Sequence, residues 1–290
     1  TEADTMVAVE DLYRPYRPKR RTRATIAKEK GLEPLANIIM LQMTVEPVVK
    51  TAEEYVSEEK DVKTPEDAVA GAKDIIAESI SDNADYRTRI RELTFKEGVL
   101  TSAAKDAEAK TVYEMYYNFS EPAAKMAGHR ILAVNRGENE KILTVKIEAP
   151  VDKILAYLEK QIIVRDNQYT TGIIREAIED SYERLIAPSI EREIRNQLTE
   201  TAEAGAIKVF GKNIEQLLLQ PPITGHVVLG WDPAFRTGCK LAVVDATGKV
   251  LDTTVIYPTA PQNKVTEAKA VLKKLIKKYL SLIHISEPTR

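Results

Sequence analysis

Residues 227–258 read VVLGWDPAFRTGCKLAVVDATGKVLDTTVIYP. The stretch contains three apolar runs, at residues 227–231, 241–244 and 250–256, and an Asp-Ala-Thr-Gly turn separates the last two. Short apolar runs joined by an Asp…Gly turn are typical of antiparallel strands. An amphipathic helix is predicted next, at residues 264–279, because its apolar residues recur with a helical period. Residues 223–280 are therefore predicted to form an α/β unit of three antiparallel strands and a helix.

Asp232 lies at the end of the first predicted strand, since Pro233 has no N–H to continue the ladder. One interpretation is a ligand for a divalent metal in two-metal phosphodiester cleavage, which requires several carboxylates to converge. Asp245 and Asp252 are poor partners, because they fall at or beyond the far end of the hairpin. The other interpretation is that Asp232 accepts hydrogen bonds from the turn at residues 236–238. We favour the second interpretation and treat Asp232 as a weak catalytic and metal-binding candidate.

The turn after Asp232 also carries groups that can contact phosphate. Arg236, Thr237 and Lys240 provide donors, and Gly238 permits close approach of the backbone. The alternative is a solvated hairpin end, and the sequence does not decide between the two. We take Arg236 and Lys240 as candidate nucleic-acid ligands.

The preceding residues, 1–222, are predicted to be mostly helical. Thr64 and Pro65 begin a helix that extends to residue 81, because threonine caps a helix N-terminus and proline suits its first turn. We expect no strand between residues 11 and 117, with helices at 83–95 and 96–109. A helix near 130–134 and a strand at 143–147 follow, the latter from its alternating pattern. Gln220-Pro221-Pro222 ends the helical region and predicts a domain boundary.

A basic segment occupies residues 13–30 near the start of the chain. From residue 14 to 30 it has eight Lys and Arg residues and one acid, Glu29. Lysine and arginine contacts to phosphate give salt-dependent, sequence-independent affinity, and Tyr13 and Tyr16 could stack on unpaired bases. The alternative is that the tyrosines and prolines pack on the scaffold while the arginines bridge its acids. The candidate nucleic-acid ligands here are Arg14, Arg17, Lys19, Arg20, Arg21 and Arg23.

The composition of the chain and the motifs that it lacks exclude several classes of function. The chain is 43% apolar and 30% charged with a formal net charge of −2, so any nucleic-acid surface must arise from local clustering. The single cysteine excludes an intrachain disulfide and suits the cytoplasm. No phosphate-binding loop motif occurs, the three histidines have no metal-ligand spacing, and no apolar run is long enough to span a membrane. We expect no membrane partner and no cofactor, except Mg²⁺ if the metal-site interpretation of Asp232 holds.

Three separated motifs resemble one family. They are DLYRPYRPKRRTRATIAKEKGLEPLA at residues 11–36, GHRILAVNRGENE at 128–140, and LLLQPPITGHVVLGWDPAFRTGCKLAVVDATGKVLDTTVIYP at 217–258. The order of the three motifs and their amino-acid sequences are similar to those of the bacterial Tex transcription accessory proteins. The resemblance implies an elongated helical scaffold followed by a YqgF, ribonuclease-H-like domain whose nuclease fold is degenerate. Two departures occur in the last motif: Ala234 replaces an expected glycine, and Trp231 replaces a smaller aliphatic residue.

The resemblance implies a nucleic-acid-binding transcription accessory protein that is not a catalyst. Its expected partners are RNA or DNA, bound largely without sequence preference, and the transcription machinery. The alternative is an active metal-dependent nuclease of the ribonuclease H/resolvase type. The chain is expected to stop inside the YqgF-like domain, without the helix-hairpin-helix and S1 domains of the family. Residues 281–290, SLIHISEPTR, continue no pattern and are predicted to be a non-native tail.

Overall fold

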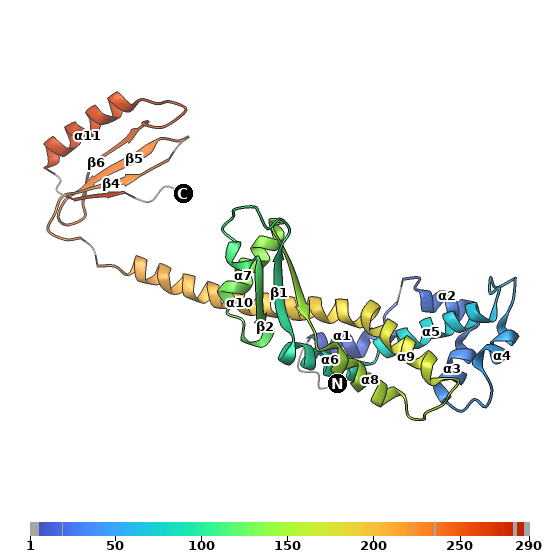
Figure 1. The fold of residues 1–290 in the computed structure, drawn as a ribbon. Helices are drawn as coiled ribbons and strands as arrows, with labels where there is room; N and C mark the ends of the chain where they lie inside the picture. The colour runs from blue at the N-terminus through green and yellow to red at the C-terminus, as the bar shows by residue number, and fades with distance from the viewer. Residues whose placement is uncertain (1–5, 19, 222, 235, 281–282, 287–290) are drawn as a thin grey trace. The chain divides into compact units, whose positions relative to one another are not determined.

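The computed structural model describes residues 6–18, 20–221, 223–234, 236–280 and 283–286 (Figure 1). The chain divides into two compact units, Thr1–Phe210 and Gly211–Arg290. The first is helical with one small sheet, and the second is an α/β unit. The division falls within the long helix α10, Ala187–Leu218.

The first unit is built mainly from helices. The long α5 helix contacts α2, α3, α4 and α9. The α5 helix begins at the predicted residue, Pro65. Thr64 and Asp67 form a capping box there, in which each side chain accepts a hydrogen bond of 3.1 Å from the other's backbone N–H. The helices are α1 (Met6–Tyr13), α2 (Arg23–Glu29), α3 (Glu33–Leu41), α4 (Val48–Ala52), α5 (Pro65–Ser81), α6 (Ala84–Glu97), α7 (Gly128–Asn139), α8 (Val151–Ile162), α9 (Thr171–Asp180) and α10. A π-helical stretch at Ser181–Ile186 joins α9 to α10, and short 3₁₀ turns lie at Arg14–Tyr16, Glu53–Tyr55, Glu114–Tyr116 and Ala123–Lys125.

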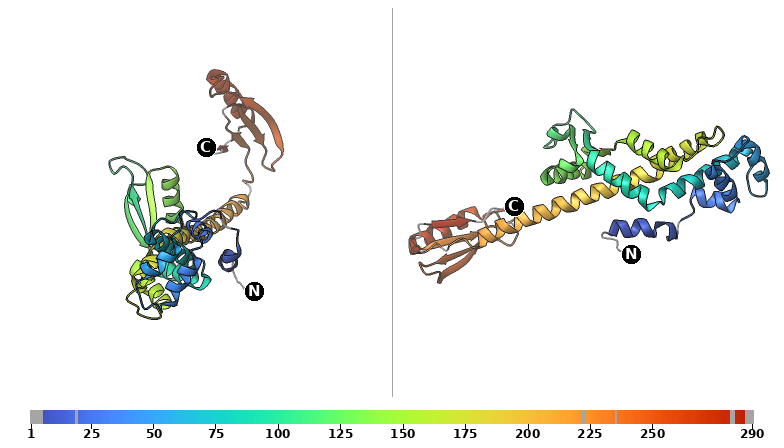
Figure 2. Two further views of the ribbon diagram at one scale, coloured as in Figure 1. Left: turned by 90° about the vertical axis from the view of Figure 1, so that its right-hand side faces the viewer. Right: turned by 90° about the horizontal axis from the view of Figure 1, so that it is seen from below.

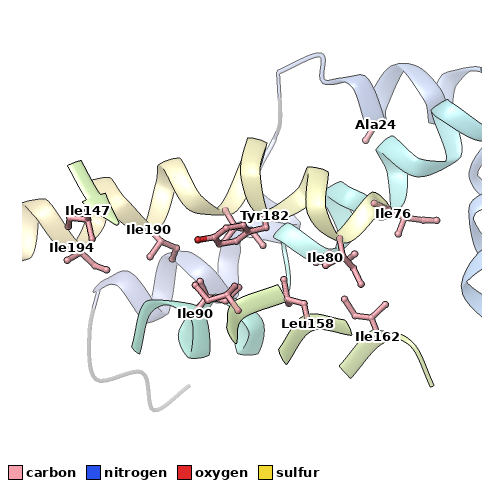
Figure 3. Close-up of a cluster of buried hydrophobic side chains, with 14 of the residues drawn as sticks. Ala24, Ile76, Ile80, Ile90, Ile147, Leu158, Ile162, Tyr182, Ile190 and Ile194 are labelled. Carbon is pink, nitrogen blue, oxygen red and sulfur yellow. The ribbon is translucent and has the colours of Figure 1, made fainter. Parts of the chain in front are cut away.

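Apolar side chains from α5, α6, α8 and α10 meet in the core of this unit. In Figure 3, Ile80, Ile90, Leu158 and Ile190 point toward one another around Tyr182, and all five are buried. Fully burying an aliphatic side chain of this size is worth about 1.5–3 kcal/mol. The helices are therefore held by one continuous apolar cluster.

The sheet of the first unit corrects two predictions: the helix at residues 96–109, and the absence of a strand between residues 11 and 117. Strands β1 (Val99–Ala104), β2 (Asn118–Pro122) and β3 (Leu143–Glu148) form an antiparallel sheet in the order β2-β1-β3. The prediction of a helix at residues 96–109 is wrong, whereas the predicted helix and strand at 130–147 are confirmed as α7 and β3. Gly98 ends α6, and a Cβ there would lie 2.2 Å from the Thr94 carbonyl oxygen. The run VLTSAA shows little alternation and becomes a strand because β2 and β3 flank it.

The second unit contains the three predicted strands and the predicted helix. Strands β4 (Val228–Asp232), β5 (Cys239–Val244) and β6 (Val250–Ile256) pair antiparallel, and α11 (Val265–Tyr279) packs on them (Figure 1). A fourth strand, β7 (Ile283–Ser286), pairs parallel with β4, so the sheet order is β6-β5-β4-β7. The fourth strand was not predicted and lies within the ten residues assigned to a non-native tail. The core that α11 shares with the sheet includes Leu229, Leu241, Val243, Ile256 and Leu275.

A buried ion network joins α1 to the rest of the first unit. The Arg87 side chain on α6 is 0% exposed, and its Nε donates to Asp11 Oδ1 of α1 at 2.5 Å. Its Nη2 donates to Glu193 Oε1 of α10 at 2.6 Å and to Ser189 Oγ at 2.9 Å. Arg91 completes the network, with Nη2 2.5 Å from Asp11 Oδ2 and Nε 2.9 Å from Glu193 Oε2. Two guanidinium groups and two carboxylates therefore balance their charges across three helices.

Replacing Asp11 with alanine should destabilise the first unit strongly. The substitution leaves the buried Arg87 guanidinium without its Nε acceptor, and breaking one side of a buried ion pair costs about 3–5 kcal/mol. Urea unfolding followed by circular dichroism measures the change. Glu92→Ala is the matched control, because Glu92 pairs with Arg89 on the exposed surface, where an ion pair is worth about 0.5 kcal/mol. Equal losses in the two variants would show that the network does not hold α1.

Candidate nucleic-acid interface

The backbone of the basic segment is fixed at both ends. After Asp11, the chain turns through the 3₁₀ helix Arg14–Tyr16, which contains Pro15 in its first turn. At the other end Thr22 caps α2: Thr25 N donates to Thr22 Oγ1 at 3.1 Å, and Thr22 N donates to Thr25 Oγ1 at 2.7 Å. In Figure 2 the chain leaves α1 and crosses to α2. The segment is therefore anchored to the scaffold on either side of its exposed part.

Several cations of this segment are already paired within the molecule. Arg14 Nε lies 3.4 Å from Asp82 Oδ1, and Arg21 Nη2 lies 3.3 Å from Glu29 Oε2. Lys28 pairs with Glu33, and Lys30 pairs with Asp61. The arginine-to-acid alternative thus holds for part of the segment.

Arg17 and Arg20 differ from these cations. Both are exposed, and neither makes an ion pair or side-chain hydrogen bond with any residue that the structure describes. Lys19, between them, lies outside the described residues. Of the segment's described cations, Arg17 and Arg20 are therefore exposed and have no paired or nearby acid among the described residues.

Arg23 faces acids of the scaffold. It borders a cleft of 450 Å³ that Asp61, Asp67 and Asp74 also line. Burial raises the pKa of Asp74, and the nearby guanidinium groups of Arg184 and Arg23 oppose that rise. The hydrogen bond from Arg184 lowers the pKa of Asp180, and Arg23 adds to this effect. Arg23 is exposed and makes no ion pair with a described residue, but it lies close enough to Asp74 and Asp180 to favour their charged forms.

The two tyrosines of the segment face solvent. Tyr16 is 79% exposed and Tyr13 is 54% exposed. Neither ring makes a ring–ring or cation–π contact with another described residue. The expectation that they pack along the helical scaffold is therefore wrong.

In the second unit, Asp232 lies opposite Lys240 across the β4–β5 ladder. Lys240 Nζ is 3.8 Å from Asp232 Oδ2, and both side chains are exposed. They border a cleft of 750 Å³ on the sheet, together with Trp231, Thr253 and Val255. Among the described residues, no hydrogen bond joins the turn at 236–238 to the Asp232 carboxylate, so the predicted contact is not observed there.

The turn after β4 accommodates Ala234 without strain. Ala234 is not among the residues with positive φ, so the expected cost of replacing glycine there does not arise. Gly238 does have positive φ, at +81°, and a Cβ there would lie 2.5 Å from Tyr257 Cε1. Arg236 and Thr237 are exposed, and Arg236 has no ion pair with a described residue.

The other acids of this unit are engaged away from Asp232. Asp245 accepts hydrogen bonds from the Thr247 hydroxyl and from the backbone of Thr247 and Lys249, and these lower its pKa. Hydrogen bonds from Tyr279 and Lys278 lower the pKa of Asp252. Within the described part of the chain, no three His, Cys, Asp or Glu side chains are grouped as metal ligands.

The polar residues of the second motif, at 128–140, serve the packing of α7 on α10. Asn135 Nδ2 donates to Thr199 Oγ1 at 2.8 Å, and Arg195 of α10 forms an ion pair with Glu138. Arg136 pairs with Glu140 on its own helix. These residues form the C-terminal half of α7, which extends beyond the helix predicted near 130–134. Sequence reasoning missed these partners and the Arg87 network, because the paired residues lie far apart in the chain.

Two family models match the chain. The model described as Tex central region-like matches residues 43–210, and the model described as Tex protein YqgF-like domain matches residues 226–289. The chain belongs to the Tex family. The resemblance seen in the three motifs is thus confirmed, as are the helical scaffold and the YqgF-like domain.

Similar proteins come from several bacteria and from animals. The chain is 57% identical over 93% of its length to uncharacterized protein YdcI of Bacillus subtilis, of which it covers 38%. It is 37% identical over 90% of its length to protein tex of Bordetella pertussis, covering 35% of that protein. It is 31% identical over 87% of its length to S1 RNA-binding domain-containing protein 1 of Homo sapiens, covering 27%. This Tex family chain therefore spans little more than a third of the first two relatives.

No helix among the described residues is long and apolar enough to cross a membrane.

Substitution of Gly238 should destabilise the second unit more than substitution of Gly248. Both glycines have positive φ, but only at Gly238 would a Cβ meet other atoms, because Gly248 has none within 4 Å. Gly248→Ala should cost about 1 kcal/mol from backbone strain alone. Gly238→Ala should cost about 1–3 kcal/mol more, because Tyr257 must also shift. Thermal unfolding of the two variants compares them, and equal stabilities would contradict the crowding at Gly238.

Proposed function

We propose that this chain is the part of a Tex-type transcription accessory protein that contacts nucleic acid through its basic segment. Arg17 and Arg20 bind phosphate groups of RNA or DNA without sequence preference. The supporting observation is that these two exposed guanidinium groups have no acidic partner among the described residues, whereas Arg14 and Arg21 do. A guanidinium that is already paired with an acid must lose that partner before it contacts phosphate. Arg17 and Arg20 therefore provide most of the affinity.

Two further features support this proposal. The net charge of −2 makes non-specific attraction by the whole molecule weak, so binding depends on the local cluster. The human relative is named for an S1 RNA-binding domain, and bacterial relatives are named for Tex. The transcription machinery is a second partner class that we propose for the whole protein.

Charge reversal at Arg17 and Arg20 should weaken binding and reduce its dependence on salt. For single strands, the loss of two phosphate contacts lowers the slope of log K against log salt by about 1.4. Fluorescence anisotropy with labelled oligonucleotides over a range of KCl concentrations measures both quantities for Arg17→Glu/Arg20→Glu.

The control for this experiment is Lys125→Glu/Lys160→Glu. It makes the same change in net charge at two exposed lysines that have no ion pair among the described residues. A loss of affinity in the control that equals the loss in the arginine variant would show that only net charge matters. Unchanged binding in the arginine variant would overturn the proposed function.

Asp232→Asn should leave oligonucleotide binding unchanged. Its carboxylate pairs with Lys240 at an exposed site, and our proposal gives it no contact to phosphate. The nuclease alternative predicts instead that cleavage of a labelled oligonucleotide requires Mg²⁺ or Mn²⁺ and is abolished by this substitution. Gel analysis of the oligonucleotide after incubation distinguishes the two functions.

A further inference from the structure

We infer that Tyr13 and Tyr16 form a two-ring clamp that holds one unpaired base, beside the phosphate contacts of Arg17 and Arg20. The inference rests on the proposed function and specifies the class of nucleic acid: single-stranded RNA or DNA. The observation behind it is that both tyrosine rings are exposed to solvent.

The two tyrosine rings are exposed although the backbone that carries them is anchored on both sides. Tyr16 is 79% exposed and Tyr13 is 54% exposed. Asp11, two residues before Tyr13, has a side chain that is only 5% exposed and is bound to two arginines. Arg14, between the tyrosines, pairs with Asp82 of the scaffold. The rings are therefore presented to solvent by an ordered backbone.

The local helix places the two tyrosines on one side. Tyr13 is the N-cap of the 3₁₀ helix Arg14–Tyr16, so Tyr13 and Tyr16 are three residues apart. Side chains three residues apart in a 3₁₀ helix eclipse, and three residues advance about 6 Å along its axis. The two rings make no ring–ring contact with each other.

This spacing suits one base. Stacked bases repeat at about 3.4 Å, so a base between two rings needs them about 7 Å apart, close to the advance from Tyr13 to Tyr16. Pro15 restricts the backbone between the rings, which lowers the entropy lost when the base is bound. A base that is paired in a duplex is already stacked on its neighbours, so the clamp selects unpaired bases.

The charges beside the rings fit the same ligand. Arg17 follows Tyr16 directly, and Arg20 lies three residues further along. A single strand presents a phosphate on either side of each base, so a base held between the rings brings phosphate toward these guanidinium groups. Aromatic rings interleaved with free cations are the usual combination in surfaces that bind single strands without sequence preference.

The test uses the full 290-residue chain with three labelled probes: oligo-U RNA, oligo-dT DNA and a mixed-sequence DNA duplex. Each is about twelve nucleotides long, within the site sizes of single-strand binders. Tyr13→Leu/Tyr16→Leu should weaken binding of single strands by about tenfold or more, with little change for the duplex. Tyr13→Phe/Tyr16→Phe keeps the rings and should bind as the natural chain does. Loss on the RNA arm, the DNA arm or both supports the clamp and identifies its nucleic acid.

Phe210→Leu is the matched control, because Phe210 is a 64% exposed ring distant in sequence from the basic segment. A second readout is independent of affinity. The fluorescence of one 2-aminopurine in oligo-dT should be quenched by stacking at saturating protein, with quenching retained in the Phe variant and lost in the Leu variant. Single-strand binding and quenching that persist in the Leu variant would overturn the clamp.

The failure of the clamp can be separated from failure of the proposed function. If Arg17→Glu/Arg20→Glu weakens binding while the Leu variant does not, the basic segment binds phosphate and the clamp is wrong. If neither variant changes binding, both proposals are wrong. If the Leu variant loses single-strand and duplex affinity equally, the tyrosines support the segment without holding a base, and the clamp is again wrong.

Discussion

The guanidinium of Arg87 is the constraint on which the first unit depends. It is fully buried between α1, α6 and α10, and its orientation is fixed by Asp11, Ser189 and Glu193. A buried ion pair adds little net stability, because desolvation offsets the attraction, but only one arrangement satisfies its hydrogen bonds. Arg87 Nη1 nevertheless has no hydrogen-bond partner among the described residues, so they do not completely satisfy the network. Its main effect is to fix where α1 lies and in which direction the chain leaves it.

That direction connects packing to the proposed function. α1 buries one residue, Asp11, so without the network little would hold this helix to the scaffold. Tyr13 and Arg17 follow within two turns of Asp11, and their position is therefore set by charges buried below them. Asp11 and Glu193 pair with Arg87 and Arg91 inside the unit. Arg17 and Arg20 are exposed and have no acidic partner among the described residues. The distribution of partners, more than the number of arginines, distinguishes a structural arginine from one that can bind phosphate.

The sequence predicted those features that depend on near neighbours. The start of α5 at Pro65, the strand predicted at residues 143–147 and the hairpin of the second unit all follow from caps, alternation and turn residues. The strand β1 was missed because its pairing with β3 joins residues 39 to 49 positions apart, and its own residues favour no one structure. The Arg87 network was missed for the same reason, since Asp11 and Glu193 are contacted from α6 across the length of the unit. The exposure of Tyr16 required the structure, because the same residues were compatible with packing.

The pairing of charged side chains also matters at the end of β4. The register places Lys240 directly opposite Asp232, so the two groups partly neutralise each other and neither is fully available to a ligand. Arg236 has no such partner among the described residues, which makes it the candidate cation of that turn. Positive φ falls at Gly238 and not at Ala234, so the turn depends on the absence of a Cβ beside Tyr257. The motif around Asp232 is thus explained first by the packing of a turn against β6, and Arg236 is the cation there that has no ion pair with a described residue.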